Sequence, residues 1–125
     1  MALKVSSTSE IRQFRGSLNK RLREKLRELS VESSATIPAK MTRYACVGAE
    51  YADLARGKLD FAHYMGSLKP WDHAAGVLIH QEAGGFSAYV DTISPYVPTP
   101  PHRGQTIIMA PRKEAWFQLR DLTTT

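Results

Sequence analysis

The side chains of this sequence that could bind a metal ion or a phosphate group lie between residues 46 and 85. Asp72 follows an extended segment and Pro70, a residue that fits the first turn of a helix. A carboxylate there gains from the positive end of the helix dipole and can cap free N–H groups. It can equally stay ionised to bind a hard cation such as Mg²⁺. Position alone leaves both interpretations open.

Cys46 and four histidines are the other groups with possible chemistry. Cys46 would need a basic partner to act as a nucleophile, and the sequence shows no Cys/His/acid arrangement, so a buried or pocket-lining thiol is expected. No Cys or His-x-x-x-His pair supports a zinc site. Surface or supporting positions are therefore expected for the histidines, which are His63, His73, His80 and His102.

Hydrophobic periodicity predicts the elements that must position these groups. Helices are expected from about residue 10 to 29, capped by Ser9 or Thr8 and interrupted at Gly16-Ser17, then over 45–56, 70–83 and from Pro111 onward. Strands are expected at 3–5, 59–64, 86–90 and 106–110, and loops over 30–38 and 91–105. This alternation predicts a layered α/β domain.

The same patterns predict which side chains are buried. In the helix over 45–56, Val47, Tyr51, Leu54 and Ala55 should face inward. In the strand over 59–64, one face should carry Leu59, Phe61 and His63, and the other Asp60, Ala62 and Tyr64. Trp71 and Trp116 lie among apolar neighbours, which favours core positions over base-stacking surfaces.

Length and composition limit the classes of protein. The 125 residues fit one domain, and no apolar run approaches the ~20 residues that span a bilayer. A single cysteine and the lack of a signal core favour the cytoplasm. Residues 1–45 carry a net charge of +6 and residues 46–125 carry −1, so most of the +5 excess lies on one predicted helix. A solvated helix face is the expected reason, and nucleic-acid binding by residues 12–27 ranks last.

Three short motifs within residues 71–85 carry a family resemblance: Trp71-Asp72, Ala74-Ala75-Gly76 and Glu82-Ala83-Gly84-Gly85. Together they closely resemble the carboxy-terminal signature of the inositol monophosphatase family, which are Mg²⁺-dependent phosphomonoesterases. Residues 45–51, followed by Gly57 and Asp60, resemble the family's Gly-Ser/Thr-Ala-Ala helix start and its later Gly-x-x-Asp. The resemblance is good over residues 40–122 and weak over residues 1–39.

The resemblance implies a fold and a set of site residues. It implies an α/β sandwich in which helices flank a mixed sheet, so residues 1–125 would form one domain like the carboxy-terminal half of these enzymes. Asp72 would be the family's last metal-ligating Asp, with Mg²⁺ as the cofactor. Cys46 would occupy the position of the substrate-contacting Ser/Thr, and Val47 would offer a backbone N–H beside it. Glu82 would anchor a helix end.

Two departures from the family pattern change the expectation. The family's Asp-Pro-Ile/Leu-Asp-Gly-Thr/Ser segment and upstream Glu are absent from this sequence, and residues 64–69 hold no acid of the kind that binds an inositol hydroxyl. One Asp cannot complete a Mg²⁺ site. We therefore expect a part of a hydrolase of sugar or inositol phosphate metabolism that is inactive alone and acts on a phosphate monoester only when an amino-terminal domain complements it. No catalytic residue can be assigned.

A second interpretation belongs to a different class. The domain could be a non-catalytic remnant or protein-interaction module of the same fold, which exposes an apolar face and forms a homo-oligomer or binds a partner chain.

Overall fold

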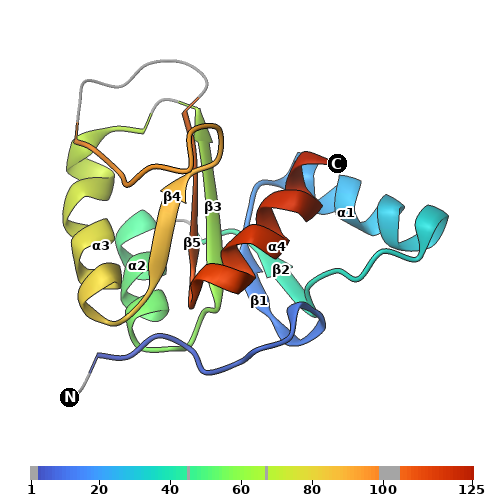
Figure 1. Cartoon of the computed structure of the whole chain (residues 1–125), viewed down its shortest axis with the longest axis horizontal. Helices are drawn as coiled ribbons and strands as arrows, with labels where there is room; N and C mark the ends of the chain where they lie inside the picture. The colour runs from blue at the N-terminus through green and yellow to red at the C-terminus, as the bar shows by residue number, and fades with distance from the viewer. Residues whose placement is uncertain (1–2, 45, 67, 99–104) are drawn as a thin grey trace.

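In the computed structural model, which describes residues 3–44, 46–66, 68–98 and 105–125, one sheet lies between two layers of helices (Figure 1). This confirms the expected α/β sandwich. The strands are β1 (Arg15–Ser17), β2 (Lys40–Thr42), β3 (Phe61–Gly66), β4 (Phe86–Tyr89) and β5 (Gln105–Ala110). The helices are η1 (Ile11–Gln13), α1 (Lys20–Ser33), α2 (Val47–Ala55), α3 (Pro70–Glu82) and α4 (Lys113–Thr124).

The sheet is mixed, with the strand order β2-β1-β3-β5-β4. β1 pairs in parallel with β2 and β3, whereas β5 runs antiparallel to both β3 and β4. The register places Ala62 opposite Met109 and Ala88 opposite Ile108. β5 therefore lies inside the sheet, between β3 and β4, although it is the last of these strands in sequence. This interior position fits its nearly complete burial.

Alternating side chains of β3 and β5 build a core on each face of the sheet. On one face, Ala62 and Tyr64 pack with Tyr51 of α2 and Val77 of α3. On the other face, Phe61 packs with residues of α1 and α4, and these include the fully buried Leu26, Trp116 and Leu119. The predicted alternation is thus confirmed for Phe61, Ala62 and Tyr64, as is the core position of Trp116, whereas Leu59 precedes β3 and packs with Ala62 and Tyr64 instead of with Phe61.

The amino-terminal third differs from the prediction of a helix from residue 10. Arg15–Ser17 is a strand, and α1 begins only after Asn19, whose side chain accepts a hydrogen bond from the Leu22 N–H at 2.8 Å. A Cβ on Gly16 would lie 2.1 Å from the Phe61 ring, so this glycine permits close contact between β1 and β3. Residues 3–5 form no strand, and α1 extends to Ser33 into the predicted loop.

One prediction of burial is wrong, and another is narrowed. Trp71 is 76% exposed, because it lies on the outer side of α3, where the Lys69 ammonium lies 5.7 Å from its ring centre. The three histidines within the described residues, His63, His73 and His80, are buried, which excludes the surface positions expected for them but not the supporting ones. His102 lies outside the described residues.

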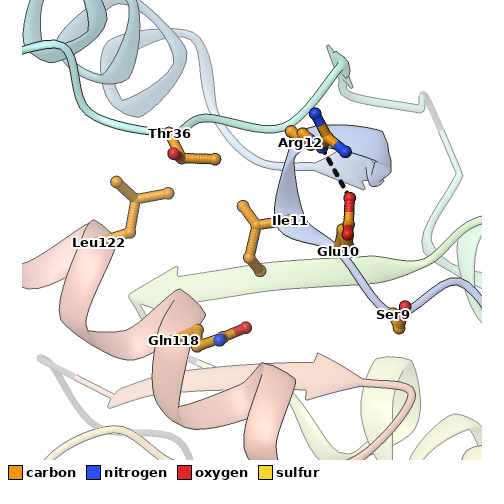
Figure 2. A pocket seen from close by; sticks show the side chains of 7 residues that line it. All are labelled: Ser9, Glu10, Ile11, Arg12, Thr36, Gln118 and Leu122. Carbon is orange, nitrogen blue, oxygen red and sulfur yellow. Dashed lines mark hydrogen bonds and ion pairs between the residues drawn. The ribbon is translucent and has the colours of Figure 1, made fainter.

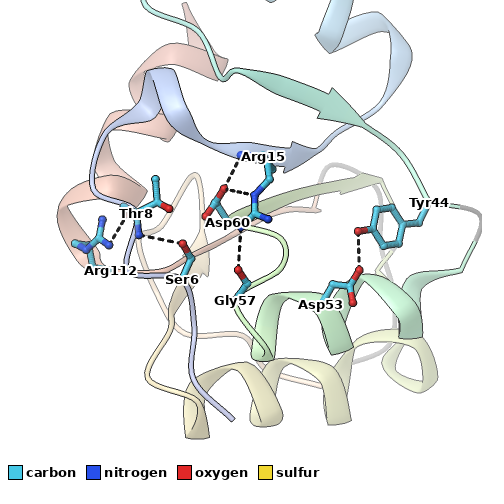
Figure 3. Close-up of polar contacts among 8 residues, drawn as sticks. All are labelled: Ser6, Thr8, Arg15, Tyr44, Asp53, Gly57, Asp60 and Arg112. Carbon is cyan, nitrogen blue, oxygen red and sulfur yellow. Dashed lines mark hydrogen bonds and ion pairs between the residues drawn. The ribbon is translucent and has the colours of Figure 1, made fainter. Parts of the chain in front are cut away.

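An ion pair between a partly exposed arginine and a buried carboxylate joins β1 to the start of β3 (Figure 3). The Asp60 carboxylate is fully buried and accepts from the Arg15 backbone N–H at 2.6 Å and from the Arg15 Nε at 3.2 Å. Arg15 also donates to the Gly57 carbonyl at 2.9 Å. Asp60 therefore stabilises the fold. In the same view, Tyr44 donates to Asp53 at 2.7 Å and connects the segment before α2 to that helix.

Candidate functional site

The N-termini of α2 and α3 lie toward the same end of the sheet. α2 leads into β3 and α3 follows it through short connections, so both helices run opposite to β3 and begin near its carboxyl end (Figure 1). The two helices pack closely because α3 has a glycine at the crossing, where a Cβ on Gly76 would lie 2.3 Å from the Tyr51 ring. Two positive helix ends therefore face one region, which favours an anion.

Asp72 lies in the first turn of α3 and is exposed. Lys69 is the N-cap residue and makes no side-chain cap bond, and Pro70 occupies the first helical position. Within the described residues, no hydrogen bond or ion pair involves the Asp72 carboxylate, so it does not cap the helix. The structure therefore leaves this carboxylate available for a cation or a ligand.

Cys46 and Val47 form the start of α2. Cys46 is the N-cap residue in extended conformation, and its side chain makes no cap bond. Its thiol is exposed, which excludes the buried position expected for it but not the pocket-lining one. The Glu50 N–H bonds to the Cys46 carbonyl at 3.3 Å, whereas the first N–H groups of the helix, including that of Val47, have no intrahelical acceptor. They can donate to a phosphate oxygen.

Glu50 is a buried carboxylate in the first turn of α2, and it connects four segments. It accepts from the hydroxyl of Ser17 in β1, from the Tyr64 hydroxyl of β3 at 3.1 Å and from the Tyr44 N–H at 3.3 Å. The Arg43 guanidinium lies 3.7 Å from it. These charge-assisted bonds fix the start of α2 against the sheet.

Aromatic rings continue this network toward Asp72. Tyr51 stacks on Tyr64 with ring centres 5.6 Å apart, and the His73 ring lies edge-on to Tyr64 at 4.9 Å. The Tyr51 hydroxyl lies 2.9 Å from His73 Nδ1. Burial lowers the pKa of His73, and the neighbouring Asp72 carboxylate opposes this shift. Burial also raises the pKa of Tyr51 and Tyr64, so both stay neutral hydroxyl groups.

Sequence reasoning missed this supporting network. Glu50, Tyr64 and His73 hold the two helix starts in place, yet only their chain positions, not their contacts, are visible in the sequence. The signal that could have found Glu50 is an acid inside a helix start of otherwise small or apolar residues, Cys46 to Ala49. Glu82, in contrast, is exposed at the end of α3.

The residues present do not by themselves form a Mg²⁺ site. Mg²⁺ requires near-octahedral oxygen coordination, and Asp72 is a single carboxylate. Across the described ranges, no three His, Cys, Asp or Glu side chains gather so that they could hold a metal ion. The described residues therefore supply only one side of a binding site, with a carboxylate acceptor on α3 and backbone N–H donors on α2.

A separate cavity of about 440 Å³ lies between η1 and α4, on the opposite face of the sheet (Figure 2). Its lining includes Glu10 and Arg12, which are exposed and pair with each other at 2.6 Å. Ile11 and Leu122 contribute apolar surface. This cavity shares no residue with the region around Asp72 and brings no group toward it.

Comparison with known families gives a match to the model described as the inositol monophosphatase family, over residues 2–114. The fold resembles an inositol monophosphatase from Anabaena (TM-score 0.71, 22% identity) and an IMPase from Thermotoga maritima (TM-score 0.75, 18% identity). It also resembles a hypothetical protein from Pyrococcus horikoshii with similarities for inositol-1 monophosphatase (TM-score 0.67, 26% identity).

These alignments cover nearly all of this chain but less than half of each relative. They cover 98%, 98% and 97% of this chain, and 47%, 44% and 44% of the three solved chains, respectively. No curated protein sequence gives a significant match. In the described part of the chain, no helix has the length and apolar character needed to cross a membrane.

Proposed function

Because the chain belongs to the inositol monophosphatase family, we propose that it is the carboxy-terminal half of a Mg²⁺-dependent phosphatase of inositol or sugar phosphates. The observation that carries the proposal is the exposed, unbonded Asp72 carboxylate at the start of α3, beside the start of α2 with its free N–H groups. A carboxylate for a cation next to donors for an anion suits a phosphate group bound through a metal ion.

The proposed roles follow from this arrangement. Asp72 would be one ligand of Mg²⁺, and the Val47 N–H would donate to the phosphate, with the Cys46 side chain at the edge of the substrate. Glu50 and the stacked tyrosines would hold the two helix starts at a fixed separation. The other carboxylates would come from a complementary amino-terminal domain, so this chain alone would not turn over substrate.

The test uses a chimera in which this chain replaces the carboxy-terminal half of the Thermotoga maritima relative. We expect Mg²⁺-dependent phosphate release from inositol phosphate or a sugar phosphate by the chimera, and none by the isolated chain. Asp72→Asn should abolish the release by the chimera, because the amide is a weaker metal ligand. Asp121→Asn, which neutralises an exposed carboxylate on α4, is the matched control and should leave the rate unchanged.

Two outcomes would contradict this proposal. Turnover by the isolated chain that disappears in Asp72→Asn would show that the chain holds a complete site. Equal activity of the chimera and its Asp72→Asn variant would remove Asp72 from the metal site.

A second candidate function is a protein-interaction module, and the exposed apolar side of α3 favours it. Trp71, Leu78 and Ile79 are 76%, 57% and 42% exposed, and their spacing places them along one side of the helix. Sedimentation velocity should then show self-association that rises with concentration and is lost in Leu78→Ser/Ile79→Ser. A monomer at all concentrations would contradict the self-associating form of this module.

A further inference from the structure

A cavity of about 320 Å³ lies on the α1 and α4 side of the sheet, apart from the region around Asp72. α1 supplies Arg21 and Lys25, β3 supplies His63, and Thr106 comes from β5. Its volume is in the lower range of cavities that hold small molecules. The cavity is therefore large enough for a phosphate group together with a small polar body.

The charge of the cavity favours an anion. Arg21 and Lys25 are one turn apart on α1, so their side chains are neighbours. Neither of them forms an ion pair with another described residue. Among the described residues that line the cavity, Asp91 alone has a carboxylate, and it is exposed. The N-terminal turn of α1, a helix of 14 residues, adds partial positive charge beside Arg21.

His63 forms part of the cavity wall. It is only 5% exposed, yet it lines the cavity. Its Nδ1 is buried without a hydrogen-bond partner among the described residues. Such an unpaired atom costs free energy, and because it exposes almost no surface, a ligand can bond to it only after the ring turns toward the cavity. Burial lowers the pKa of His63 to about 4, so at neutral pH the ring has one N–H donor and one acceptor.

We propose that this cavity binds a small phosphorylated ligand, with the phosphate between Arg21 and Lys25 and the polar body against His63 and Thr106. Asn19 bounds the cavity at the start of α1, and its amide contacts Met65 Sδ at 3.1 Å. The cavity lies on the sheet face opposite to α2 and α3, so it is a second site, independent of the proposed phosphatase function.

The test is isothermal titration of the full chain with glucose 6-phosphate, inorganic phosphate and glucose at constant ionic strength. We expect saturable binding of glucose 6-phosphate, weaker binding of phosphate and none of glucose. Arg21→Gln/Lys25→Gln should weaken binding by at least about tenfold, because two charge-assisted contacts are lost. The matched control Arg27→Gln/Lys58→Gln removes the same charge from exposed positions outside the cavity and should change affinity by less than about twofold.

Two further measurements separate this site from the region around Asp72. Titration in EDTA without Mg²⁺ should give the same affinity for glucose 6-phosphate, because the region around Asp72 is proposed to bind phosphate through a metal ion. The His63 ring proton resonances should shift during the titration and saturate with the calorimetric affinity. The proposal is overturned by unchanged affinity in Arg21→Gln/Lys25→Gln, by equal loss in the control variant, or by no saturable binding up to about 10 mM.

Discussion

Gly76→Ala should destabilise the domain by about 2–3 kcal/mol, although alanine is the better helix former. The added Cβ would lie 2.3 Å from the Tyr51 ring. Tyr51 is 3% exposed, stacks on Tyr64 and bonds to His73 through its hydroxyl, so its ring cannot move aside. α3 would have to move away from α2, which would also separate Asp72 from the start of α2.

Gly48→Ala is the matched control for this substitution. Gly48 lies in α2 and is exposed, and a Cβ there would meet only the Cys46 sulfur at 3.7 Å. It should stabilise the domain by up to about 1 kcal/mol through helix propensity. Urea unfolding monitored by circular dichroism gives both values. In a Tyr51→Leu background, the cost of Gly76→Ala should fall, and a constant cost would disprove the proposed contact.

Acid should remove about 6 kcal/mol of stability between pH 6.5 and 4 through His63 and His80, and His73, whose pKa is also lowered by burial, adds to this loss. Burial lowers the pKa of His63 and of His80 from 6.5 to about 4. Above pH 6.5 both rings are neutral in the folded and the unfolded chain. As the pH falls below 6.5, only the unfolded chain takes up these protons, so unfolding becomes easier until the folded state also protonates near pH 4. Each histidine then contributes about 3 kcal/mol.

The variant that isolates one of these contributions is His80→Leu. His80 is fully buried, and neither ring nitrogen has a hydrogen-bond partner among the described residues. An apolar replacement leaves no polar group unpaired. Urea unfolding between pH 7.5 and 4.5 should therefore show a loss that is smaller than that of the unaltered chain by the contribution of one histidine. Hydrogen bonds from Tyr44 and Arg56 lower the pKa of the Asp53 carboxyl. Asp53 therefore changes the stability only as the pH falls below its ordinary pKa of 3.8, outside this pH range. An unchanged slope in His80→Leu would contradict the prediction.

Local pattern was sufficient for the carboxy-terminal two thirds of the fold. The helix that became α3 has Pro70 at its first position and glycines after its end, and the continuous apolar run from Ile107 to Ala110 marks β5. Each of these elements carries its own start and stop signals. Family motifs then predicted the mixed sheet between helices, which the structure confirms.

The amino-terminal third could not be predicted because long-range contacts decide it. Phe14, Leu18 and Leu22 have helical spacing, yet Gly16 pairs with Phe61 of β3, which is 45 residues away. Pairing in the sheet outweighs local periodicity here. The cap at Asn19 was the overlooked local signal.

For the candidate site, the sequence predicted which residues belong to it but not which contacts hold them in place. Motifs identified Asp72, Cys46 and Val47, and the roles given to them remain predictions. The supporting contacts of Glu50 depend on Ser17, Tyr44 and Tyr64 coming together, which no sequence spacing specifies. The exposure of Trp71 likewise depends on which side of α3 packs against α2.

The position of β5 between β3 and β4 determines the order in which a growing polypeptide can complete the sheet. During synthesis, β3 and β4 leave the ribosome first and have no partner on their facing edges until residues 105–110 follow. Open strand edges are templates for pairing with other chains. Nascent chains stalled before residue 105 should therefore be the species that chaperones retain and that aggregates when they are absent.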